Sequence, residues 1–154
     1  MRRQYHLEGV ISRPQALVHP YAYVPFEVPP RCTRIEVAYH YAPVSPTDEP
    51  ATLDIGLFDI RGTEPHTGGF RGWSGSDRRQ FFVERAAATP GYVAGPLPAG
   101  IWSVILGGYE IPEDGLRWWL TVSLEVAASG RLNVSRVPNS AGPANAPRNP
   151  STGW

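Results

Sequence analysis

The sequence predicts an all-β fold, an antiparallel β-sandwich of jelly-roll character formed by a single domain. Six or seven short runs alternate apolar and polar residues, which is the period of a half-buried strand. The chain of 154 residues also holds 16 Gly and 17 Pro, the residue types that make turns between such runs. No stretch has the length of the crossover helices, about a dozen residues each, that a parallel sheet requires. Together these observations favour an antiparallel sandwich.

The first three strands are predicted at residues 5–11, 21–28 and 33–41, with a loop at 14–20. Alternation places three residues on one side of the second strand: Tyr21, Tyr23 and Pro25. Because Pro25 has no N–H to donate to a ladder, we expect this strand at a sheet edge or interrupted by a bulge. The third strand has the clearest alternation, with these residues on its buried side: Ile35, Val37, Tyr39 and Tyr41.

Four more strands are predicted at residues 52–60, 80–83, 101–106 and 118–126. The first of them buries Leu53, Ile55 and Leu57, with Phe58 as a further candidate. Residues 84–89 are the one stretch with helical character. They are long enough for one turn at most, since isolated helices need about 12 to 15 residues.

Residues 70–106 constrain the architecture most, because they predict a strand, a long excursion and a second strand. Phe70 and Trp73 fall in the Gly-rich excursion, and we expect at least one of them to be buried, since a mobile loop exposing both would promote aggregation. Ser74 lies in a partial match to the nucleophile elbow G-x-S-x-G. The match fails at its last position, where Ser76, followed by Asp77, stands in place of the glycine. The stretch therefore predicts no catalytic constellation.

The charge of the chain argues against two classes of partner. Fourteen basic residues, all Arg, balance fourteen acidic ones, and the pI is about 6.9. Nucleic acids and anionic membranes are bound by basic patches, so neither is expected as a partner. The lone Cys32 permits no intrachain disulfide. The sequence shows no apolar signal core and no run long enough to span a bilayer, so the expected compartment is the cytoplasm.

No metal or cofactor site is predicted within the chain. The four histidines lie in separate elements and none is paired at metal-ligand spacing: His6, His19, His40 and His66. The aspartates that could serve a calcium ion lack the D-x-D-x-D-G spacing: Asp54, Asp59, Asp77 and Asp114. The five Trp residues could form a sugar-stacking platform. The favoured interpretation is core or interface, because Trp102 lies in an apolar strand and Trp118 and Trp119 must point to opposite faces.

Several short motifs together resemble one known module. They are YVPFEVP at residues 23–29, DIGLFD at 54–59 and FRGWSG at 70–75, followed by TPGY at 89–92, GP at 95–96 and G-x-W at 100–102. In this order they resemble the N-terminal β-sandwich that precedes the metal-dependent PHP domain of CehA/McbA-type hydrolases, the group that includes carbaryl hydrolases. The likeness covers roughly residues 21–126.

The resemblance implies that catalysis lies outside this chain. In that family a Trp-Tyr-x-Gly-Asp-Leu-His-x-His segment follows the sandwich and supplies the first metal ligands, whereas this chain stops at Trp154. A divalent metal (Zn, Mn or Fe) is accordingly expected only in the missing catalytic domain. We expect residues 1–134 to form the sandwich and residues 135–154 to be an extended linker or arm. An excised N-terminal region is favoured over a natural stand-alone sandwich.

The leading hypothesis is thus a non-catalytic accessory domain of a PHP-type metal-dependent hydrolase. Its expected partners are the PHP-type catalytic domain of the same protein and further copies of the chain. The alternatives are a carbohydrate or small-ligand binding module and, third, a self-contained hydrolase. No catalytic, cofactor-binding or metal-ligating residue is assigned. The candidate interface or ligand-facing residues are Phe70, Arg71, Trp73, Tyr92 and Trp154.

Overall fold

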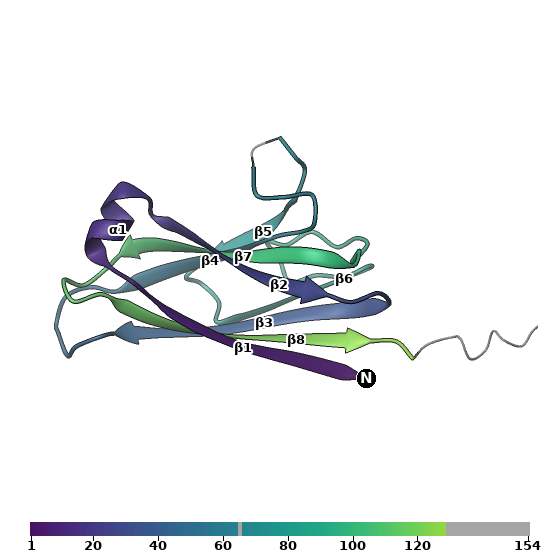
Figure 1. Cartoon of the computed structure of the whole chain (residues 1–154), viewed down its shortest axis with the longest axis horizontal. Coiled ribbons are helices and arrows are strands. Elements are labelled where there is room, and N and C mark those ends of the chain that lie inside the picture. Colours follow the sequence, from purple (N-terminus) through teal and green to yellow (C-terminus); the bar gives the residue numbers. More distant parts are fainter. Residues whose placement is uncertain (65, 129–154) are drawn as a thin grey trace, which may run out of the picture.

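Two four-stranded antiparallel sheets face each other in the computed structural model, which describes residues 1–64 and 66–128 (Figure 1). Sheet A has the strand order β1-β8-β3-β6 and sheet B the order β2-β7-β4-β5. The strands are β1 (Arg2–Ile11), β2 (Tyr21–Val28), β3 (Cys32–Pro43), β4 (Thr52–Phe58), β5 (Phe70–Gly75), β6 (Gln80–Glu84), β7 (Gly100–Glu110) and β8 (Leu116–Val126). Consecutive strands mostly alternate between the sheets, as in an eight-stranded jelly roll. The predicted all-β antiparallel sandwich is confirmed.

The strand order also confirms the place expected for Pro25. Strand β2 lies at the edge of sheet B, where Pro25 is opposite Ser103 of β7. Its side chains alternate in exposure along the whole strand, with Val24, Phe26 and Val28 buried. An edge strand accommodates proline because the positions on its open side donate to no ladder.

The core lies between the sheets, and its buried aromatic residues donate hydrogen bonds to backbone carbonyls. Tyr39 of sheet A donates its hydroxyl to the carbonyl oxygen of Leu53 in sheet B at 2.7 Å. Burial raises the pKa of Tyr39 to about 12, so the phenol keeps this proton at neutral pH. Trp102 is fully buried and donates its indole N–H to the carbonyl of Pro98 at 2.9 Å. Buried aromatic residues thus keep their polar atoms bonded.

The two adjacent tryptophans of β8 lie on opposite faces of sheet A, as neighbouring residues of a strand must. Trp118 is buried between the sheets, whereas Trp119 lies on the outer side of sheet A, half-buried, with its ring stacked on His40 at 5.1 Å between centroids. The core interpretation is therefore confirmed for Trp102 and Trp118.

Two predicted local structures are wrong. Residues 14–20 were expected to form a loop, but α1 (Arg13–Val18) begins there because Ser12 caps it, its Oγ accepting from the N–H of Gln15 at 3.2 Å. Residues 84–89 form no helix. Thr89 instead bonds back to Phe82 through both its N–H and its hydroxyl, at 3.0 and 2.9 Å, which folds the segment along β6. None of the described helical segments has the length and hydropathy needed to cross a bilayer.

The third correction concerns the stretch that begins at Phe70, which is strand β5 rather than an excursion. It pairs with β4 through two register shifts, and its glycines absorb them: Gly72 has φ +145° and Gly75 has φ +58°. The glycines that suggested a loop are therefore the residues that let an irregular strand pair. The predicted tail at 135–154 lies outside the described residues.

Gly72 is required because its φ is positive and because a side chain there would collide with its neighbours. Mutation can separate these two reasons. A methyl group there would lie 2.6 Å from the carbonyl oxygen of Gly91 and would collide with the ring of Tyr92. Gly62 also has positive φ, +108°, but a methyl group there would meet nothing closer than 3.9 Å.

We predict that Gly72→Ala lowers the free energy of unfolding by at least about 2 kcal/mol more than Gly62→Ala, because only the former adds overpacking to backbone strain. Urea unfolding of both variants measures the difference. Equal losses would show that β5 and the loop at Gly91 can separate without cost.

Candidate functional site: the outer face of sheet B

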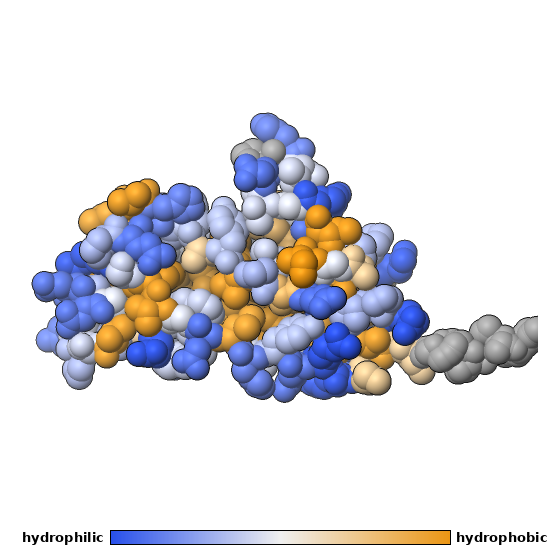
Figure 2. Space-filling model, in the orientation of Figure 1, coloured by the Kyte–Doolittle hydropathy of each residue, from blue (hydrophilic) through white to orange (hydrophobic). Residues whose placement is uncertain are grey.

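The outer faces of the two sheets differ in chemistry. The outer face of sheet A carries paired charges, with Arg2 3.5 Å from Glu125 and Arg34 2.8 Å from Glu84. The outer face of sheet B carries five aromatic side chains, which we call the aromatic face: Tyr21, Tyr23, Phe58, Phe70 and Trp73. Apolar side chains also reach the surface below the loop that rises between β4 and β5 (Figure 2). Sheet B therefore presents the apolar side of the molecule.

The rings of the aromatic face support one another around a floor of small residues. Phe58 lies between Tyr23 and Phe70, with ring centroids 6.2 and 5.6 Å away. Trp73 covers Gly56, where a methyl group would lie 2.7 Å from its ring. Such edge-to-face contacts hold exposed rings in place at little entropic cost. The rings of the face thus pack against one another.

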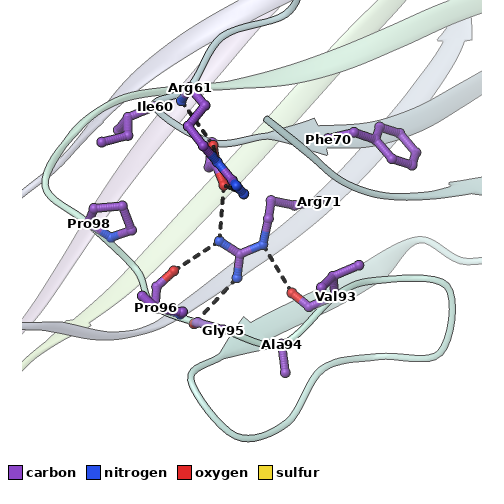
Figure 3. A pocket seen from close by; sticks show the side chains of 10 residues that line it. Ile60, Arg61, Phe70, Arg71, Val93, Ala94, Gly95, Pro96 and Pro98 are labelled. Atoms are coloured by element: carbon purple, nitrogen blue, oxygen red, sulfur yellow. Dashed lines mark hydrogen bonds and ion pairs between the residues drawn. The ribbon is translucent and has the colours of Figure 1, made fainter. Parts of the chain in front are cut away.

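A pocket of about 340 Å³ opens at the Phe70 end of this face. We call it the Arg71 pocket. It is lined by Asp59, Ile60, Arg61, Phe70, Arg71, Val93, Ala94, Gly95, Pro96 and Pro98. Most of these residues come from the turn after β4 and from the loop before β7, which Arg71 holds together (Figure 3).

The Arg71 guanidinium is buried, with 4% of its side chain exposed, and is enclosed by backbone carbonyls. Its Nε donates to Val93 at 3.1 Å, and its Nη1 donates to Pro96 at 2.9 Å. A longer bond joins Nη2 to the carbonyl of Gly95 at 3.4 Å. The guanidinium also lies over the ring of Trp102, 5.0 Å from its centroid. Arg71 therefore fastens the loop to the sheet.

Asp59 balances this charge. Its carboxylate accepts from Nη1 of Arg71 at 3.4 Å and from the backbone N–H, Nε and Nη2 of Arg61 at 2.9, 3.1 and 2.7 Å. Burial alone would raise the pKa of Asp59, but the hydrogen bonds and charge of Arg61, with the bond from Arg71, bring it below its ordinary value. Burial lowers the pKa of Arg71 against the pull of Asp59, yet an arginine stays charged at neutral pH. The pair is ionic.

The structure separates the five residues that the sequence selected. Phe70 is 53% exposed and lines the Arg71 pocket, while Trp73 lies half-buried on the aromatic face. Arg71 is buried, and its donors are bonded to the loop. At least one of Phe70 and Trp73 was expected to be buried. This expectation is met only in part, because Trp73 is half-buried and Phe70 is exposed. Trp154 lies outside the described residues.

Tyr92 lies in the core and not on the ligand-facing surface. It stacks on Phe81 with 3.9 Å between ring centroids and shares a 2.9 Å hydrogen bond with Ser74. Burial raises its pKa. Ser74 is thereby hydrogen-bonded to a phenol.

Sequence reasoning missed the apolar lining of the pocket. Ile60 ended the strand predicted at residues 52–60 but lies in the turn after β4, and Val93 lies in the loop before β7, where periodicity says nothing about burial. Both are exposed in the structure. Alternation grouped Tyr21 and Tyr23 with Pro25 on one side of their strand, but the structure was needed to show that this side faces outward and joins the other strands of the face. Among the described residues, no group of three or more potential metal ligands converges.

We predict that Asp59→Asn lowers the free energy of unfolding by about 3 kcal/mol at pH 7, because it leaves the buried Arg71 charge without its anion. Asp48→Asn, at an exposed position, should change it by less than about 0.5 kcal/mol.

The effect of Asp59→Asn should also depend on pH. Because the pKa of Asp59 is lower in the folded state, its stabilisation is complete above the unfolded value of about 3.9 and is lost as the pH falls through the folded value. The difference between wild type and variant should be constant from pH 5 to 7 and shrink below about pH 4. Denaturant unfolding across this range measures it, and a difference that grows towards acid pH would contradict the ion pair.

Comparison with known proteins gives no family for the chain. No family model matches it, and no curated protein matches it. A crystal structure of PliG from Aeromonas hydrophila, a periplasmic lysozyme inhibitor of g-type lysozyme, is similar with a TM-score of 0.39 and 12% identity. The match covers 80% of this chain and 86% of that chain. A likeness at this level assigns neither family nor activity.

These findings correct the predicted resemblance to the sandwich of CehA/McbA-type hydrolases, since no sequence comparison supports it and the structural neighbour is an inhibitor. The expectations that depended on this resemblance are wrong as well. They are the role beside a PHP-type metal-dependent hydrolase, the catalytic domain as partner, and further copies of the chain as partners. The expected cytoplasmic location conflicts with the periplasmic neighbour. The physical reason is that the motifs are structural: DIGLFD builds β4 and its turn, and FRGWSG builds β5.

Proposed function

We propose that this chain is a non-catalytic protein-binding module, which takes an apolar side chain of its partner into the Arg71 pocket and lays the adjoining partner surface on the aromatic face. One observation carries the proposal: the pocket has apolar walls, and the polar groups at its floor are bonded to one another. The following steps give the chemical class of the occupant and then its size.

The occupant of the pocket should be apolar. Asp59 accepts four hydrogen bonds from Arg61 and Arg71, and the Arg71 donors are bonded to the loop. A polar group that enters against Asp59 and Arg71 would lose its water without gaining an equivalent partner, which costs free energy. An aliphatic or aromatic group loses no hydrogen bond on entering. Apolar burial then supplies about 25 cal/mol for each Å² removed from water.

The surroundings of the pocket favour a protein surface over a small molecule. Four apolar residues around or near it are each 43% to 57% exposed: Ile60, Phe70, Val93 and Ile101. The aromatic face continues this surface across sheet B. Large apolar patches on soluble domains mark interaction sites, and interfaces are enriched in Tyr, Trp, Phe and Arg.

The buried titratable groups support a non-catalytic role. Burial raises the pKa of both Tyr39 and Tyr92, and each phenol is hydrogen-bonded in the core. Asp59 is held as a paired carboxylate at the pocket floor. A general acid or base works best with a pKa near the working pH and with access to substrate, and these groups lack that access.

Selection of random displayed peptides on the full chain tests the proposal. We predict that enriched peptides carry a Phe, Leu or Met anchor and are displaced by N-acetyl-phenylalaninamide but not by N-acetyl-serinamide. In amide NMR spectra the phenylalanine derivative should shift signals of residues 59–61 and 93–95.

A matched pair of variants controls the site. Val93 and Val10 are 55% and 45% exposed, but Val10 lies on sheet A. Val93→Asp should weaken peptide binding by roughly tenfold or more, as loss of an anchor contact does, and Val10→Asp should leave it unchanged. Equal binding by both variants would refute the site. Displacement of the peptides by chito- or cello-oligosaccharides would instead identify the face as a carbohydrate platform.

A further inference from the structure

A second cavity, of about 290 Å³, lies at the opposite end of the aromatic face. Its walls include Tyr21, Asp54, Trp73 and Tyr109, and its floor is the glycine pair at the end of β7. The rings of Tyr21 and Trp73 meet at 81° with 6.4 Å between centroids, and Tyr109 is 75% exposed at the mouth. Three aromatic side chains and one carboxylate therefore line the same cavity.

The floor is open because Gly107 has no side chain. A methyl group there would lie 3.1 Å from Cη2 of Trp73, 3.4 Å from Cε1 of Tyr21 and 3.5 Å from Cβ of Asp54. These three side chains thus converge on the same point above the strand. Any larger residue at 107 would fill the space that they enclose.

The Asp54 carboxylate has no positively charged partner in the part of the chain that the structure describes. Within residues 1–64 and 66–128, no hydrogen bond or ion pair joins its oxygens to another group, although the side chain is half-buried. Burial raises the pKa of Asp54, and the negative charge of Asp77 raises it further. A cation in the cavity would offset both effects. This contrasts with Asp59, which is fully paired at the other end of the face.

We propose that this cavity binds a compact organic cation of the ammonium class, with its charge against Asp54 and its methyl or methylene groups against Tyr21, Trp73 and Tyr109. Aromatic rings attract cations through the negative potential of their faces, and they favour alkylated ammonium groups, which are easily desolvated. A metal ion fits poorly, since calcium takes six to eight oxygen ligands and one carboxylate is present here. Two sources carry this ammonium chemistry, a free molecule and a side chain of a protein, and the test separates the two.

The proposal is independent of the Arg71 pocket, because Asp54 lies in β4 and Asp59 follows that strand, about 16 Å further along the extended chain. It is tested by NMR titration of the full chain with choline and with its neutral isostere 3,3-dimethylbutan-1-ol at fixed ionic strength. Choline should shift the amides of Gly107 and Gly108 and the indole N–H of Trp73, and bind at least about tenfold more tightly than the isostere. Equal affinity for the two would overturn the proposal, as would calcium or magnesium moving the same signals in place of choline.

The source of the ammonium is decided by comparing choline with Nα-acetyl-trimethyl-lysine amide. Tighter binding of the lysine derivative assigns the site to a protein side chain, and tighter binding of choline assigns it to a free molecule. Both outcomes support the ammonium class.

Variants then identify the groups responsible. Asp54→Asn should weaken choline binding by roughly tenfold, while Asp114→Asn, at an exposed turn, should not change it. Tyr109→Ala removes a wall from an exposed position and should weaken binding several-fold without affecting folding. Full affinity in Tyr109→Ala and in a folded Asp54→Asn would overturn the proposal.

Discussion

The buried ion pair of Arg71 with Asp59 is the interaction on which the pocket end of this sandwich depends. It joins three segments that are distant in sequence: strand β5, the turn after β4 and the loop before β7. Without the guanidinium, the carbonyls of Val93 and Pro96 would lose their donor, and Asp59 would keep Arg61 as its cationic partner. The pair is therefore less a source of net stability than a constraint that fixes one arrangement of the loop.

That constraint explains how an apolar surface can be exposed and still be ordered. Sheet A carries ion pairs and the stacked His40 and Trp119 on its outer side, whereas sheet B carries aromatic rings that pack on one another over Gly56 and Gly107. Both ends of the aromatic face hold an aspartate, but the two are used differently. Asp59 is paired with Arg61 and Arg71, so the pocket at its end is apolar. Asp54 is unpaired among the described residues, so the cavity at its end is anionic. The two ends therefore suit different groups of a ligand.

Sequence reasoning reached the fold because alternation is a local signal. It placed β2, β3, β4 and β8 and put Pro25 at an edge, since each inference depends on one strand and its period. It missed α1, whose six residues show no apolar face and whose main signal is the cap at Ser12. It also took the glycines of β5 for a loop, because a bulged strand and a turn require the same residue type. The site depends on register between sequence-distant strands: nothing local shows that Trp73 lies over Gly56, that Tyr92 stacks on Phe81, or that Arg71 reaches the loop at Val93. The short motifs that suggested a hydrolase-associated module are residues that build strands and turns, so they carried no information about chemistry.

Hydrogen exchange of the Arg71→Lys variant tests the central claim most directly. Lysine keeps the positive charge but lacks the planar fork that reaches several carbonyls at once. The account predicts that the amides of Val93 and Gly95, which bond to Arg71 and Glu84 backbone carbonyls, lose protection while those of Ile35 and Val37 in β3 keep it. Unchanged protection at Val93 and Gly95, or an equal loss across both sheets, would contradict the role of Arg71 as the fastening of the pocket.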